Sequence, residues 1–159
     1  MDEYYFTEKG YKKLKDEIEK IEKLIKRDIA KEIATARAHG DLRENAEYAA
    51  AKDKQQMYMV KLGQLQERFA RARIVRKQDS RPDTVALGKR VKIKDRDSGD
   101  ELEYIILGDG ETNVEKRIIS YHSPLARALI GHKRGDLVDV RLPRGIKKLE
   151  ILGIEFYED

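Results

Sequence analysis

The stretch AHGDLRENAEY, residues 38–48, joins two long segments of similar character and decides how the first half of the chain folds. It contains Gly40 and three acidic residues, Asp41, Glu44 and Glu47. A glycine just past a helical pattern is typical of a helix end. An Asp followed three residues later by a Glu is typical of a capping box that starts the next helix. Two helices joined by so short a link fold back on each other, so we predict an antiparallel helical hairpin.

Apolar residues on both sides of this bend recur at alternating spacings of three and four, which is the pattern of a coiled-coil seam. The seam before the bend consists of Tyr11, Leu14, Ile18, Ile21, Ile25, Ile29 and Ile33. The seam after the bend consists of Tyr48, Ala51, Gln55, Tyr58, Leu62, Leu65, Phe69 and Ala72. The last two steps of the first seam are both of four residues, which predicts a local unwinding, or stutter. We expect helices over 8–39, with Thr7 as N-cap, and from about 42 to 76.

The second half of the chain changes to the period of β-strands. Strands are predicted at 90–93, 102–107, 117–121, 137–142 and 148–157. The segment SPLARALIG, 123–131, has Ser before Pro and ends in Gly, which indicates one short helix. We therefore predict an α+β protein. Its parts are a coiled-coil hairpin over 1–77 with its tip at 40–48, a linker over 78–88, and a small antiparallel sheet domain with one short helix over 89–159.

Composition limits the class of protein. The chain of 159 residues has no Cys, which excludes a disulfide framework and a thiolate metal site. No run approaches the roughly 20 apolar residues that span a bilayer, and the start lacks a secretory signal, so we expect a cytoplasmic protein without a membrane partner. Residues 1–78 hold 19 Lys and Arg against 14 Asp and Glu, whereas 79–159 hold 15 against 16. An anionic partner is thus expected at the N-terminal half.

The acidic bend has two readings that the residues alone leave open. In the first, Asp41 and Glu44 only cap the second helix and suit its dipole. In the second, two carboxylates three residues apart converge on a hard cation such as Mg²⁺. Because Mg²⁺ requires about six oxygen ligands, the free protein would bind it poorly. A metal role therefore predicts that a partner supplies the remaining ligands.

Three stretches of the chain resemble the Gre family of bacterial transcript-cleavage factors. They are FTEKGYKKLKDEIEKI near the start, ARAHGDLRENAEYAAAKDKQQ at the bend, and ISYHSPLARALIG in the second half. The bend and the AAAK that follows it are more similar to the A-type than to the B-type of the family. The resemblance covers nearly the whole chain and implies that the sheet domain is FKBP-like.

The resemblance also implies a function. A Gre factor inserts its hairpin tip into the secondary channel of RNA polymerase, with the sheet domain on the coiled-coil rim of that channel. Asp41 and Glu44 would be the catalytic pair that completes a Mg²⁺ site in the polymerase active centre. The polymerase would then cut the 3′ end of its own backtracked RNA. The chain would be an accessory factor, expected to act as a monomer, and not itself an enzyme.

The resemblance suggests roles for further residues. Arg37 and Lys52 would contact the extruded RNA, although a solvated helix face explains both equally well. Gly40, Asn45 and Tyr48 would support the tip, with packing the ordinary explanation of Tyr48. The Ser123 and Pro124 end of the short helix would dock on polymerase, in addition to capping that helix.

Two alternative functions stay open at this point. A Gre-like fold can inhibit polymerase, although retention of Asp41 and Glu44 in GDLREN argues against that role. The chain could also be a coiled-coil nucleic-acid-binding module without metal chemistry. That second alternative predicts affinity for free RNA with a steep dependence on salt.

Overall fold

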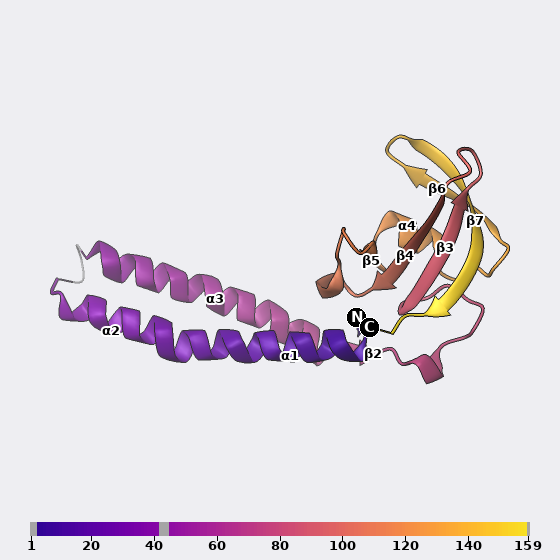
Figure 1. Cartoon of the computed structure of the whole chain (residues 1–159). Coiled ribbons are helices and arrows are strands. Elements are labelled where there is room, and N and C mark those ends of the chain that lie inside the picture. The colour runs from indigo at the N-terminus through magenta and orange to yellow at the C-terminus, as the bar shows by residue number, and fades with distance from the viewer. Residues whose placement is uncertain (1–2, 42–44, 159) are drawn as a thin grey trace. The chain divides into compact units, whose positions relative to one another are not determined.

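The protein is described by a computed structural model of residues 3–41 and 45–158 (Figure 1). These residues form two compact units. The hairpin unit comprises Tyr11–Ala72, and the sheet unit comprises Tyr4–Gly10 together with the chain from Arg73 onward. The limits of 1–77, 78–88 and 89–159 remain a sequence prediction.

The hairpin unit consists of helices that run in opposite directions (Figure 1). They are α1 (Glu8–Lys23), the π-helix η1 (Leu24–Ile29), α2 (Ala30–Ala38) and α3 (Ala46–Ala70). The predicted seams form the interface, with Leu14, Ile18, Ile21, Ile29, Ala51 and Leu65 buried. The Tyr11 and Phe69 rings stack with centroids 5.0 Å apart. Ion pairs flank the seam between Lys54 and Glu32 at 3.0 Å and between Lys61 and Glu17 at 3.8 Å. The predicted fold class is confirmed.

The π-helix lies where the seam spacing changes. Steps of four residues from Ile25 to Ile29 and from Ile29 to Ile33 exceed the α-helical repeat of 3.6. In a regular α-helix, these side chains would therefore drift away from the partner helix. The wider π-turn absorbs the extra rotation, and Ile29 is completely buried. The expected stutter thus takes the form of η1.

The second helix is shorter at its C-terminal end than the sequence predicted. It ends at Ala70, and the chain continues as strand β2 (Ala72–Ile74), which pairs with β1 (Tyr4–Phe6). The Val75 N–H donates to the Phe6 carbonyl at 2.8 Å, and the Phe6 side chain is buried. The seam continues through position 72, so local periodicity favoured a helix. A strand partner more than sixty positions earlier in the chain outweighs that preference.

The first turn of α1 is held within the sheet unit. The Thr7 hydroxyl accepts from the Gly10 N–H at 3.1 Å, which confirms Thr7 as the N-cap. The same hydroxyl donates to the Glu111 carboxylate, which also accepts from the Gly108 N–H at 3.2 Å. A Cβ at position 10 would overlap that carboxylate, so Gly10 is required by close packing.

The sheet has the strand order β5-β4-β3-β7-β6. Its strands are β3 (Lys89–Asp95), β4 (Glu101–Leu107), β5 (Ile118–Ser120), β6 (Leu137–Leu142) and β7 (Gly145–Phe156). Short 3₁₀ turns lie at η2 (Lys77–Asp79) and η3 (Asp109–Glu111). Helix α4 (Pro124–Leu129) contributes Ala126 and Leu129 to the core between helix and sheet. The remaining fully buried residues of that core come from β3, β4, β6, β7 and Val85.

One strand pairing differs from the predicted antiparallel sheet. β5 runs parallel to β4, with Ile105 opposite Ile118 and Leu107 opposite Ser120, so the sheet is mixed. The connection over 108–117 carries the chain back along β4 before β5 begins. It ends in a tight turn in which Arg117 has a φ of 56°. Strand patterning in the sequence does not encode this direction, because it depends on the path of the loop.

The solvent-facing side of the sheet carries paired charges. Ion pairs join Arg90 Nη1 to Glu155 Oε1 at 3.0 Å, Lys92 Nζ to Glu101 Oε2 at 3.6 Å, and Arg96 Nη1 to Glu150 Oε1 at 3.4 Å. An antiparallel sheet with one face on the core commonly presents polar residues on the other face. Opposite charges across neighbouring strands each contribute a few tenths of a kcal/mol to about 1 kcal/mol.

We expect the stability of the sheet unit to fall as the pH drops below about 4. The Asp97 N–H donates to the Asp95 carboxylate at 2.9 Å and is the largest cause of its lowered pKa. The Lys133 N–H donates to the Asp136 carboxylate at 2.9 Å and is the largest cause of the lowered pKa of Asp136. Because both pKa values are lower in the folded chain, the stabilisation is present above the unfolded pKa and is lost as pH falls through the folded one.

Urea unfolding between pH 6 and pH 2 measures this loss. Asp95→Asn and Asp136→Asn should each flatten the pH dependence. Asp97→Asn is the matched control, because its carboxylate accepts no backbone hydrogen bond from the described residues. An unchanged slope in the double Asp95 and Asp136 variant would contradict the assignment.

Candidate functional site

The tip of the hairpin begins where α2 ends. His39 is the C-cap of α2, and Gly40 follows with a φ of 118°, a conformation that glycine adopts without strain. The Gly40 N–H donates to the Arg37 carbonyl at 3.4 Å. Asp41 comes next and is exposed. Glu44, the second predicted catalytic residue, lies outside the described residues.

Asn45 holds both helix ends together. Its Oδ1 accepts from the Tyr48 N–H at 3.0 Å, which makes Asn45 the N-cap of α3. Its Nδ2 donates to the Ala36 carbonyl at 2.5 Å, in the last turn of α2. One side chain therefore accepts a hydrogen bond from an N–H in the first turn of α3 and donates one to a carbonyl in the last turn of α2. Through this bridge of two hydrogen bonds, Asn45 connects the two helix ends beside the tip.

The position of this cap corrects the predicted helix start. The second helix was expected from about residue 42, with Asp41 and Glu44 as a capping box. α3 instead begins at Ala46, because Asn45 takes the extended N-cap conformation. Asp41 lies four residues before that cap and cannot serve as it. The N-cap of α3 is therefore Asn45 and not Asp41.

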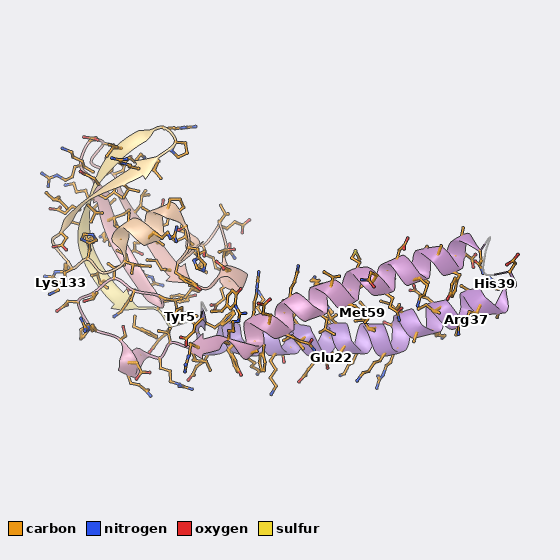
Figure 2. The ribbon with its side chains drawn as sticks, turned by 180° about the vertical axis from the view of Figure 1, so that it is seen from behind. Tyr5, Glu22, Arg37, His39, Met59 and Lys133 are labelled. Atoms are coloured by element: carbon orange, nitrogen blue, oxygen red, sulfur yellow. The ribbon has the colours of Figure 1, made fainter. Side chains whose placement is uncertain are left out.

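Two further contacts join the helices beside the bend. His39 Nδ1 lies 2.9 Å from a Glu47 carboxylate oxygen. The Arg37 guanidinium lies 5.9 Å from the centroid of the Tyr48 ring, within cation–π range. Figure 2 shows Arg37 and His39 near the end of the hairpin. Tyr48 is half-buried and packs against Arg37, which favours the packing explanation of Tyr48.

The sequence analysis missed the His39–Glu47 contact, although a signal for it exists. Residues at equal distances from the bend of an antiparallel hairpin face each other, and positions 39 and 47 satisfy that rule. Glu47 therefore has a partner across the hairpin.

The two predicted RNA-contacting cations differ in their surroundings. Arg37 lies over Tyr48, as described above, and remains exposed. Lys52 is also exposed, and its Nζ donates to the Gln55 Oε1 at 3.1 Å. Two residues further along α3, the hydrogen bond and charge of Glu32 raise the pKa of Lys54. Lys52 is therefore the more available of the two lysines for an external anion.

The described residues do not form a complete metal site. Within 3–41 and 45–158, no group of three or more His, Asp or Glu side chains is placed to hold a metal ion. Asp41 can supply carboxylate oxygens, which suit Mg²⁺, but Mg²⁺ in proteins usually retains waters and takes ligands from a substrate as well. The donor chemistry at the tip fits a Mg²⁺ ion that is shared with a partner.

The docking residues proposed from the sequence lie in the sheet unit. The Ser123 Oγ accepts from the Ala126 N–H at 3.2 Å, so Ser123 caps α4, and Pro124 opens the helix with its side chain exposed. Beside them, the rings of Tyr121 and His122 lie with centroids 3.9 Å apart. The capping role is confirmed, and docking remains a prediction. In the part of the chain that the structure describes, no helix is long and apolar enough to cross a membrane.

The fold and tip define a class of protein in which a helical hairpin carries an acidic end and a separate sheet unit follows. Comparison with protein families places the chain within that class. Residues 4–74 match the N-terminal domain of transcription elongation factors, and residues 78–156 match the C-terminal domain of GreA/GreB elongation factors. The chain belongs to the GreA/GreB family of transcription elongation factors and is of its A type.

Two GreA proteins are among the relatives that support this assignment. The chain is 44% identical over 153 residues to the transcription elongation factor GreA of Nautilia profundicola, which covers 96% of this chain and 94% of that one. It is 40% identical over 152 residues to GreA of Rickettsia prowazekii, with the same coverage. Among solved structures, the chain matches the crystal structure of GreA factor homolog 1 (Gfh1) of Thermus thermophilus. The match covers 97% of this chain and 99% of the Gfh1 chain, at 24% identity and a TM-score of 0.44.

Proposed function

We propose that this elongation factor stimulates Mg²⁺-dependent cleavage of the 3′ RNA in backtracked RNA polymerase. The hairpin enters the secondary channel and brings Asp41 and Glu44 to the polymerase active centre. The observation that carries this proposal is the N-cap at Asn45, which closes the hairpin beside the exposed Asp41. Family membership supplies the partner, a cytoplasmic bacterial RNA polymerase.

The proposed chemistry divides the work between the two proteins. Polymerase would hold the RNA and one metal ion, and a second Mg²⁺, when bound, would supply an activated water at the scissile phosphate. In this chain, Asp41 and Glu44 contribute carboxylate oxygens to that second ion. Asn45 fixes the spacing of the helix ends that carry the tip, and exposed Lys52 offers a cation to the displaced RNA. The chain acts as an accessory factor because it supplies only part of the site.

The proposal is tested by adding the purified protein and Mg²⁺ to a stalled, backtracked elongation complex with end-labelled RNA. We expect shortened RNA that carries the original 5′ end and can be extended again by polymerase. Free RNA incubated with the protein and Mg²⁺ should remain intact. Inhibition of elongation without shortened RNA would instead support the inhibitor alternative, and cleavage of free RNA would exclude an accessory role.

A further inference from the structure

The turn between β6 and β7 carries an unusual concentration of positive charge. Residues 141–148, RLPRGIKK, contain four Lys and Arg and no acidic residue. The half of the chain from 79 to 159 nevertheless holds slightly more acidic than basic residues. The turn is therefore a positively charged segment of this half in which no acidic residue offsets the cations.

These side chains are not required by the core of the sheet unit. Further down the same two strands, Val138, Val140, Leu149 and Ile151 are buried. Within 141–148, every residue is exposed except Leu142, which is half-buried. β6 and β7 remain paired up to Leu142 opposite Gly145, so the segment is an ordered two-stranded ribbon. Figure 1 shows this turn projecting from the sheet.

Ion pairs engage some of the cations of the sheet unit. Arg90, Lys92 and Arg96 each have a carboxylate within 4 Å, as described above. At the turn, the Lys147 Nζ lies 3.7 Å from the Asp95 Oδ2.

The other three cations of the turn are Arg141, Arg144 and Lys148. No carboxylate of the described residues lies within ion-pair distance of them. Asp139 is opposite Lys148 in the strand register but makes no such pair. Three neighbouring cations without counter-charges repel one another, so they cost stability unless a partner supplies anions.

Protection of the sheet edge does not explain the cluster. Charges and a proline on an edge strand discourage pairing with another chain. That role requires charges along β6, where Arg141 is the only cation of the strand. Arg144 lies in the turn, and Lys148 lies on β7, which is a central strand of the sheet and pairs with both β3 and β6 at Leu149 and Glu150.

We propose that the turn, residues 141–148, is a contact site for the phosphate backbone of double-stranded nucleic acid. Guanidinium groups bind phosphate through two parallel hydrogen bonds, and a two-stranded β-ribbon fits into the major groove of a duplex. The turn presents its cations on an exposed two-stranded ribbon, so a polyanion that contacts several of them at once fits it better than a small anion. This inference is independent of the proposed cleavage function, because the contact needs neither Asp41 nor polymerase.

The test measures binding of the full chain to a fluorescent mixed-sequence duplex DNA by anisotropy over a range of salt concentrations. Each phosphate contact contributes about 0.9 to the slope of log affinity against log salt. The triple variant Arg141→Gln, Arg144→Gln and Lys148→Gln should therefore reduce that slope by about 2.7 and weaken binding about tenfold or more at moderate salt. The single variant Arg144→Gln should reduce the slope by about 0.9.

The matched control removes three exposed cations of α1, as Lys12→Gln, Lys15→Gln and Lys20→Gln, and has the same net charge as the triple turn variant. It should keep most of the affinity and a steeper slope than the turn variant. Equal weakening by both triple variants would overturn the proposal, because net charge alone would then govern binding. Equal competition by polyglutamate at matched charge would also overturn it, since an acidic polypeptide would then fit as well.

Discussion

Asp41→Asn is expected to reduce stimulated RNA cleavage by about 100-fold while the thermal stability of the protein stays nearly unchanged. The substitution keeps the size of the side chain and removes the charge that favours Mg²⁺. Because Asn45 caps α3, the loss cannot be attributed to a disrupted helix start. Glu44→Gln should behave in the same way. Single-turnover cleavage in backtracked complexes at limiting Mg²⁺ measures the effect.

Glu47→Gln is the matched control for these two variants. It removes one negative charge from the same bend, but the Glu47 carboxylate is engaged with His39 at 2.9 Å. It should therefore retain most of the cleavage activity. Raised Mg²⁺, or Mn²⁺, should partly restore the Asp41 and Glu44 variants, and both should still compete with the unaltered protein for polymerase. Full activity of both variants at limiting Mg²⁺ would refute the metal-delivery mechanism.

The hairpin was predictable because its signal is local and repeated. Each seam residue repeats the same spacing, so one ambiguous position such as Gln55 does not obscure the pattern. The caps at Thr7 and Ser123 and the glycine at position 40 have short-range chemical causes, and the structure has all three where the sequence placed them. Strands β3, β4, β6 and β7 were located because the heptad spacing ends and short apolar runs follow, separated by turn residues.

The errors occur where distant parts of the chain decide the structure. β1 and β2 are too short to show a period, and they exist because segments more than sixty residues apart pair with each other. The parallel direction of β5 depends on the path of residues 108–117. Neither feature can be read from the composition of the segment itself.

At the tip, the sequence offered competing N-caps. Asp41 and Asn45 are both residues that favour that position, and local preference does not separate them. The Nδ2 bond to Ala36 favours Asn45, because an aspartate at that position has no N–H to donate to the other helix. The choice of N-cap therefore depends on a contact across the hairpin.

Asn45→Ala is accordingly expected to destabilise the hairpin by about 2 kcal/mol. About half of this loss comes from the N-cap bond to the Tyr48 N–H, and the rest from the bond to the Ala36 carbonyl. Without the bridge, the two helix ends that carry the tip are no longer held at a fixed separation. Cleavage should therefore fall even at temperatures where the variant is fully folded and at concentrations that saturate polymerase.

Asn45→Asp separates the two bonds. The carboxylate still caps α3, but it cannot donate to the Ala36 carbonyl, and it adds an acceptor beside that oxygen. Its thermal stability should lie between those of the unaltered protein and Asn45→Ala, while its cleavage should fall nearly as far as that of Asn45→Ala. If both variants unfold like the unaltered protein, the bridge contributes nothing to stability. If both are less stable but cleave normally at saturation, Asn45 stabilises the hairpin without positioning its acidic tip.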